Sequence, residues 1–197
     1  MNHHLFNDAA PKFPPLTTKR SESIQIFTGI SRAIESIATQ DFIRAMRGAV
    51  TGVNVVTTDG SGGRFGLTVS AFTSVSAEPP MVLICVNRKG PACAAIRENN
   101  VFCVNVLSTS QRSVAETFAG NPTVGEAYDF EAGTWALSQT GAPLLDGSVA
   151  NLDCALASAV DAGTHTIFVG DVKSIEHNDV SPLLYTDRAY RRACCEV

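Results

Sequence analysis

The chain has 197 residues, a formal net charge of −4, 45% hydrophobic residues and 17% charged residues. This length and composition favour one globular domain with a proper buried core. Nucleic-acid binding needs clustered Lys and Arg, so the acidic balance argues against that class. No apolar run approaches the roughly 20 residues of a membrane span, and the first residues lack the plan of a signal peptide. We therefore expect a cytoplasmic protein with no nucleic-acid or membrane partner.

The six cysteines do not form the pattern of a metal site. There is no CxxC motif, and the histidines are not clustered with the cysteines. Cys85, Cys103 and Cys154 lie in strand-like stretches, where a free thiol behaves as a small apolar side chain. We expect no metal site, and we interpret Cys194 and Cys195 as an exposed pair in the tail.

Residues 1–38 are predicted to be an N-terminal arm with a possible helix. Residues 1–20 contain three prolines and few periodic apolar positions, as in a disordered leader. From Ser21 to Thr39, isoleucine and phenylalanine recur at helical spacing, although Gly29 weakens the prediction.

Residues 39–192 are predicted to form the main domain, and residues 193–197 a short tail. The domain opens with a helix over Gln40–Ala49, because apolar residues fall at positions i, i+3, i+4 and i+7. Thr39 or Asp41 is the expected N-cap of this helix.

A β-hairpin is predicted next. Val53–Thr58 is rich in β-branched residues, Asp59–Gly63 is a glycine-rich turn, and Gly66–Ser74 is the returning strand. The glycine cluster is not a nucleotide loop, because it lacks the Lys-Ser/Thr of a P-loop and opens no helix.

The later elements alternate short helices with closely spaced strands. Closely spaced antiparallel strands favour a barrel, and the chain has no βαβαβ rhythm with GxGxxG. The expected strands are Met81–Val86, Val101–Leu107, Trp135–Leu137, Val149–Val160, His165–Ile175 and Leu183–Tyr185. The expected helices are Pro91–Asn99 and Ser110–Ala119, the second stopped by Gly120, and the expected loops are Asn121–Gly133, Gly141–Gly147 and the turn Asp161–Gly163.

The stretch Gly66–Leu107 carries most of the chemical information. Small hydroxyl residues recur on its first strand, Pro79-Pro80 separates two strands, and Asn87-Arg88-Lys89-Gly90 leads into a helix at Pro91. Backbone amides, hydroxyls and positive charge at a strand-to-helix junction suit a phosphate group.

A series of short motifs in a fixed order spans Asp41 to Arg191. Each motif is weak by itself, but the order of ten is specific. They are Phe42-x-x-Ala45-Met46 with Thr51-Gly52-Val53, Val55-Val56-Thr57-Thr58, Gly66–Ser76 with Pro79-Pro80, Val86-Asn87-Arg88, Phe102-x-Val104-Asn105-Val106-Leu107, Phe118-Ala119-Gly120, Pro143–Gly147, Leu152-Asp153-Cys154, Gly163–Val172, and Pro182–Tyr185 with Tyr190-Arg191. In this order they resemble the short-chain flavin reductases, the reductase components of two-component flavin-dependent aromatic monooxygenases.

The resemblance implies a mainly β fold, an FMN-binding split β-barrel with short inserted helices that forms a homodimer. It implies an NAD(P)H:flavin oxidoreductase that reduces FAD or FMN by hydride transfer. The reduced flavin would pass to a separate oxygenase that acts on an aromatic or phenolic substrate. NADH is the expected donor, with NADPH as the alternative, because we place no Lys or Arg cluster for a 2′-phosphate. The choice between FAD and FMN stays open.

The resemblance also implies a set of flavin-binding residues. Hydroxyls and backbone groups would meet the ring, the ribityl chain and the phosphate, and an arginine can clamp a phosphate bidentately. Where many relatives have a serine soon after this arginine, the chain has Lys89-Gly90-Pro91, whose amides can replace a hydroxyl. The implied residues are Thr68, Val69, Ser70, Ala71, Ser74, Val86, Asn87, Arg88, Asn105, Phe118, Gly120 and Tyr190.

Some of these residues have simpler interpretations. Asn105 is equally well explained as a satisfied buried amide, and Tyr190 as a packing residue. The segment Phe118–Gly120 is also what the end of a helix requires.

His165 is the predicted catalytic residue. The family has Gly-Asp-His beside the nicotinamide, and this chain has Gly163-Thr164-His165. Hydride transfer from nicotinamide C4 to flavin N5 needs no general acid or base in the same step, so orientation is what the protein adds. We expect His165 to position the nicotinamide. The alternatives are a non-enzymatic flavin carrier or sensor on the same barrel, and a reductase of another acceptor such as a cobalt corrin or ferric chelate.

Overall fold

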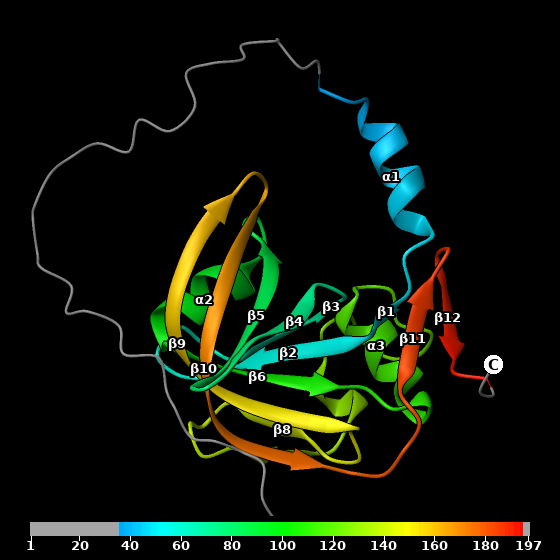
Figure 1. Ribbon diagram of the computed structural model, residues 1–197. Helices are drawn as coiled ribbons and strands as arrows, with labels where there is room; N and C mark the ends of the chain where they lie inside the picture. The colour runs from blue at the N-terminus through cyan, green and yellow to red at the C-terminus, as the bar shows by residue number, and fades with distance from the viewer. Residues whose placement is uncertain (1–35, 195–197) are drawn as a thin grey trace, which may run out of the picture. The chain divides into compact units, whose positions relative to one another are not determined.

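The computed structural model describes residues 36–194 (Figure 1). The expected arm and helix before residue 36, and the last three residues of the tail, lie outside the described residues. Helix α1 spans Thr39–Arg47, close to the prediction. Its N-cap is Ala38, which makes no side-chain capping bond, so the predicted cap at Thr39 or Asp41 is wrong. Both residues instead lie in the first turn of the helix.

A seven-stranded antiparallel sheet forms the body of the fold (Figure 1). The order β3-β2-β6-β9-β10-β5-β4 joins strands that are far apart in sequence. The strands are β2 (Asn54–Thr58), β3 (Phe65–Val69), β4 (Phe72–Ala77), β5 (Pro80–Asn87), β6 (Val101–Val106), β9 (Ala150–Ala162) and β10 (His165–His177). The predicted hairpin is confirmed by the pairing of β2 with β3.

The sheet closes on itself at Ser70-Ala71. Strands β3 and β4 are the two edges of the sheet, yet only these two residues separate them in the chain. The sheet must therefore curl until its edges approach each other, and Cys85 N donates to Ala71 O at 3.1 Å, which extends the β4–β5 pairing into the link. The predicted single strand Gly66–Ser74 is wrong, because its second half turns away to pair with β5.

Two small sheets complete the β structure. Strands β1 (Thr51–Gly52), β11 (Leu183–Thr186) and β12 (Ala189–Arg192) form one, and β7 (Trp135–Leu137) pairs with β8 (Pro143–Leu145) in the other. The prediction of a loop over Gly141–Gly147 is wrong at β8, and β12 was not predicted. The Asp161–Gly163 turn is also displaced, since Asp161 and Ala162 still belong to β9.

Two helices with one buried face each pack against the strands. Helix α2 spans Pro91–Asn99 as predicted, with proline in its first turn. The second predicted helix is divided into the 3-10 turn η1 (Thr109–Gln111) and α3 (Arg112–Phe118), and a second 3-10 turn, η2 (Phe130–Ala132), lies in the predicted loop. No helix among the described residues has the length and apolar character needed to cross a membrane.

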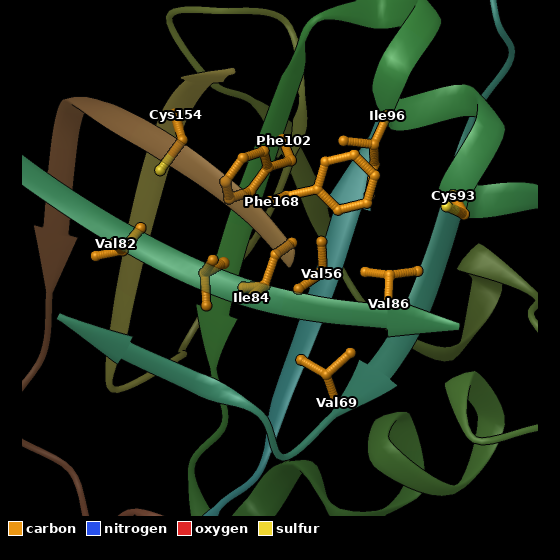
Figure 2. Close-up of a cluster of buried hydrophobic side chains, with 11 residues drawn as sticks. Val56, Val69, Val82, Ile84, Val86, Cys93, Ile96, Phe102, Cys154 and Phe168 are labelled. Atoms are coloured by element: carbon orange, nitrogen blue, oxygen red, sulfur yellow. The ribbon is translucent and has the colours of Figure 1, made fainter. Parts of the chain in front are cut away.

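The barrel core is formed by branched and aromatic side chains from several strands and α2 (Figure 2). Ile84, Phe102 and Phe168 are fully buried in it, and each stabilises the fold by about 1.5–3 kcal/mol. Gly170 allows the ring of Phe102 to approach β10, because a Cβ there would lie 2.5 Å from Phe102 Cζ. The register of β9 and β10 shifts at this glycine.

Candidate active site

A cavity of about 600 Å³ opens between β3, the start of α2 and the end of α3. Its size is that of a small-molecule site. It is lined by Arg64, Phe65, Gly66, Leu67, Thr68, Asn87, Lys89, Gly90, Pro91, Ala92, Phe118, Ala119 and Tyr128. A second cavity of about 170 Å³ shares Thr68 and Ala119 and adds Val53, Val69, Ser70, Tyr185 and Tyr190. The two cavities together follow β3 along its length.

The β3 wall is fixed to α3. Thr68 Oγ1 donates to Ala115 O at 2.8 Å, so the predicted flavin-contacting hydroxyl already ties the strand to the helix. Gly66 leaves room for the ring of Phe118, because a Cβ there would lie 2.5 Å from Phe118 Cε1. Phe118 is itself held edge-on by Phe130, with ring centroids 5.0 Å apart. The wall is therefore held in place by contacts within the protein itself.

The predicted residues after Thr68 lie around the barrel closure. Val69 and Ser70 line the smaller cavity, Val69 from the edge of the core and Ser70 exposed. Ala71 and Ser74 are exposed and line neither cavity. The hydroxyl of Ser70 is thus the exposed side-chain hydroxyl at this end of the β3 wall.

The opposite wall is electropositive. Lys89 lines the larger cavity together with Gly90, Pro91 and Ala92, which begin α2. The first turn of α2 contains no acidic residue, so its partial positive charge is not offset there. Asn87 Oδ1 accepts a hydrogen bond from Lys89 N at 2.9 Å, which fixes the turn. The ammonium group of Lys89 and the backbone amides at the start of α2 together form a suitable site for an anion.

Arg88 faces away from this wall. Its Nη2 lies 3.4 Å from Asp161 Oδ2, and its Nη1 donates to Gly163 O at 3.4 Å. Its backbone N also donates to Thr164 O at 3.0 Å. Arg88 does not line the cavity, and it fastens the β9–β10 turn to the end of β5.

Asp161 is the centre of that attachment. It accepts a hydrogen bond from Thr166 Oγ1 at 2.7 Å and pairs with Arg97 Nη2 at 2.5 Å. The hydroxyl of Thr166, followed by Arg88 and Arg97, lowers the pKa of this exposed carboxyl below its ordinary value. The turn is thereby joined to both β5 and α2.

His165 begins β10 directly opposite Asn87. Cross-strand partners point to the same face of a sheet, so the His165 side chain emerges next to Asn87 at the rim of the larger cavity. His165 Nδ1 lies 2.9 Å from Thr164 Oγ1, and the imidazole is exposed. Gly163 takes φ +58°, a left-handed conformation that makes this tight turn possible.

Two predicted residues lie in the interior instead. Asn105 is fully buried: its Nδ2 donates to Val55 O at 2.9 Å, and its Oδ1 accepts from Leu145 N and Asn151 Nδ2, each at 2.8 Å. The Val86 side chain belongs to the barrel core (Figure 2). Neither residue lines the two cavities.

Tyr190 lines the smaller cavity beside Tyr185, with ring centroids 5.3 Å apart. Burial raises the pKa of the Tyr190 phenol, so this group stays protonated at neutral pH and can donate a hydrogen bond. Gly120 ends α3 with φ +79°, and a Cβ there would lie 2.6 Å from the phenolic oxygen of Tyr128.

The sequence indicates Lys89 only as part of its turn, and it gives no prediction of a site role for Arg64, Tyr128 or Tyr185. The position of Arg64 could have indicated a site role, because it places a cation directly before the strand that bears the hydroxyl residues. Tyr128 lies in a polar loop with no periodic pattern, so nothing in the sequence places it at the cavity. Among residues 36–194, no group of three or more His, Cys, Asp or Glu side chains could hold a metal ion.

Comparisons with known proteins define the class. Residues 46–193 match the family described as flavin reductase like domain, and the chain belongs to this family. Its solved neighbours include a flavin reductase from Haemophilus somnus (TM-score 0.74, 30% identity, 80% of this chain and 100% of that one). They also include the NADH:FAD oxidoreductase SgcE6 of Streptomyces globisporus (TM-score 0.71, 34% identity, 83% and 99%). The predicted family and split-barrel fold are confirmed.

Curated relatives are similar over most of the chain. The "FMN reductase (NADH) RutF 2" of Rhizobium rhizogenes is 40% identical over 152 residues, which cover 77% of this chain and 87% of that protein. The "FMN reductase (NADH) RutF" of Pseudomonas syringae is 38% identical over 159 residues, 80% of this chain and 86% of that protein.

Proposed function

We propose that this protein is an NADH-dependent flavin reductase that reduces FAD or FMN and releases the reduced flavin. Membership of the flavin reductase family and the names of the curated relatives support this activity. The observation that carries it is the path along β3, which has an electropositive end at Lys89 and a hydroxyl-lined end at Ser70 and Tyr190.

The residues along this path fit a flavin. Lys89 and the amides at the start of α2 would hold the phosphate, and Ser70 and Tyr190 would bond to the polar edge of the ring. The bound flavin supplies the acceptor for a hydride. The chain's own task is to place the two reactants in contact and to exclude water from between them.

His165 is proposed to position the nicotinamide. Its location beside Asn87 at the rim, on a turn tied down by Arg88 and Asp161, supports a fixed orientation. Replacing His165→Ala should raise KM for NADH, while equilibrium dialysis gives the wild-type Kd for flavin. Unchanged kcat and KM for NADH in this variant would contradict this role.

The acceptor of the reduced flavin is proposed to be a separate flavin-dependent oxygenase. Among the solved neighbours, BorF is the flavin reductase component of a two-component tryptophan halogenase, and another is a homologue of nitrilotriacetate monooxygenase component B. That the partner acts on an aromatic or phenolic substrate is a further part of this proposal, and it rests on the family resemblance.

A homodimer is proposed as the working form. None of the residues of α1 is buried, and Phe42 and Met46 are each 53% exposed on it. An exposed apolar helix face of this kind marks a protein interface. Light scattering should give twice the chain mass for the wild type and a monomer for Phe42→Glu with Met46→Glu. If the double variant is still a dimer, α1 does not form the interface.

A cytoplasmic location is also proposed. Cys93, Cys103 and Cys154 are buried free thiols, as expected in a reducing compartment.

The first experiment is NADH oxidation by purified protein with and without added FAD or FMN. Oxidation that saturates with added flavin supports the reductase. Tight flavin binding without oxidation of NADH or NADPH would favour the carrier or sensor.

A further inference from the structure

Tyr128 is an exposed aromatic residue held in an unusual conformation at the mouth of the larger cavity. It is 55% exposed, and its φ is +64°. The left-handed region is a genuine outlier for a bulky residue and costs of the order of 1–3 kcal/mol, so it persists only where the surroundings impose it. Here Tyr128 N donates to Thr117 O at 3.0 Å, and the phenol packs over Gly120. The loop therefore presents this ring at a fixed place.

Arg64 is held at the same cavity by a second aromatic residue. Its guanidinium carbon lies 4.2 Å from the centroid of the Phe130 ring. Phe130 is in turn packed edge-on against Phe118 and Trp135, with centroids 5.0 Å away in both cases. The guanidinium is thus preorganised by a cation–π contact, while the Arg64 side chain remains 42% exposed.

Arg64 and Tyr128 lie at the far end of the path along β3, beyond the part that a bound FMN would occupy. Strand β3 is about 13 Å long at its rise of roughly 3.3 Å per residue, with Ser70 after it and Arg64 before it. The proposed function places the flavin ring near Ser70 and Tyr190 and one phosphate at Lys89. Arg64 and Tyr128 then remain as a cation and an aromatic face with no partner in FMN.

We propose that Arg64 and Tyr128 bind the adenylate half of FAD, so that this reductase prefers the dinucleotide to FMN. This inference rests on the proposed function. Arg64 would contact the second phosphate, for which a planar guanidinium is suited, and the Tyr128 ring would stack on adenine, as aromatic side chains do on bases in nucleic-acid complexes. The two residues are specificity determinants and take no part in hydride transfer.

The test is equilibrium dialysis of FAD and of FMN, separately, against the full-length protein without NADH. The wild type should bind FAD more tightly than FMN. Tyr128→Ala should reduce the FAD-over-FMN affinity ratio by roughly 5- to 100-fold, the range that loss of one stacked base produces. Tyr128→Phe keeps the stacking face and should keep the ratio. Arg64→Met should reduce the ratio about tenfold.

Val124→Ala is the matched control, because Val124 is in the same loop, is 86% exposed and does not line this cavity. Its ratio should equal that of the wild type. Equal losses of FAD and FMN affinity in Tyr128→Ala, or an unchanged ratio in both Tyr128→Ala and Arg64→Met, would overturn the inference while leaving the reductase intact. A wild type that binds neither flavin would instead overturn the proposed function, and this inference with it.

Discussion

Two sets of polar side chains in the same barrel have opposite environments. The interior set lies inside the fold and consists of Thr57, Asn105, Asn151 and Asp153, all of them buried. Asn105 bonds to β2, β9 and the backbone of β8, and Asp153 accepts bonds from Ser138 Oγ and Thr140 N, each at 2.8 Å. These bonds attach the β7–β8 segment to the barrel.

The rim set is exposed. Asn87 and Lys89 line the cavity, and Arg88, Asp161 and His165 lie next to them in the turn that is attached to the end of β5. Within the described residues, Asn87 Nδ2 makes no hydrogen bond, while Asn105 Nδ2 makes two. Asparagine therefore has two different roles in this protein. An asparagine whose bonds all go to buried protein groups supports the fold, and one with spare donors at a cavity is available to a ligand.

The largest expected effect is in the interior set. Asn105→Ala would leave Leu145 N, Val55 O and an Asn151 Nδ2 donor without this partner. Each buried unsatisfied group costs about 1–3 kcal/mol, so the free energy of unfolding should fall by about 3 kcal/mol or more in urea titrations. Asn121→Ala, at an exposed asparagine, should change it by less than about 0.5 kcal/mol. If the free energy of unfolding falls equally in Asn105→Ala and Asn121→Ala, the hydrogen bonds of Asn105 do not stabilise the fold more than those of an exposed asparagine.

A smaller effect should distinguish two neighbouring cations of the rim. Lys89→Met should weaken FMN binding about tenfold and leave riboflavin binding alone, because only FMN has the phosphate. Arg88→Met should leave the ratio of FMN to riboflavin affinity unchanged, since this guanidinium faces Asp161. Dialysis of both ligands measures the ratio. If the ratio of FMN to riboflavin affinity falls tenfold in Arg88→Met and not in Lys89→Met, Arg88 binds the phosphate, as the family resemblance implies.

The smallest effect concerns Asp161. The pKa of this carboxyl is lowered in the folded state, first by Thr166 and then by Arg88 and Arg97. Its contribution is therefore present above the unfolded pKa of about 3.9 and is lost as the pH falls through the lower folded value. The wild-type Tm should drop more steeply than that of Asp161→Asn below about pH 4. The effect is small because solvent screens exposed pairs.

Asp179→Asn provides the control for this measurement, because Asp179 is also exposed. Its Tm should follow the wild-type pH profile. If the profiles of the wild type and Asp161→Asn run parallel down to pH values near 3, the attachment of the β9–β10 turn does not depend on this charge.

Local chemistry made much of the fold predictable. The β2–β3 hairpin and helix α2 were found because alternation, turn glycines and a first-turn proline are local signals. Strand β8 has three residues and β12 four, too few for a period. The break at Ser70-Ala71 has no local signal either, because it depends on which strands become the edges of the sheet.

The site was less predictable because side-chain direction depends on distant partners. Asn105 lies on β6 within a run of four buried residues, so alternation could not separate an inward from an outward face. Arg88 takes its direction from Asp161, 73 residues later in the chain, and its neighbour Lys89 is left at the cavity. The resemblance implies that this turn contacts the flavin, and the structure places Lys89 of the turn in the cavity lining and Arg88 against Asp161.

The two-residue link at Ser70-Ala71 joins the two edge strands of the barrel, and Ser70 in this link also lines the smaller cavity. The backbone amide of Cys85 is protected by Ala71 O only while the link stays paired with β5. A ligand that binds the closed barrel alone would stabilise it by about 2.7 kcal/mol at a concentration of 100 times Kd. Where the link opens only after the ligand has left, hydrogen exchange at this amide should slow about 100-fold, and the amide then reports flavin binding.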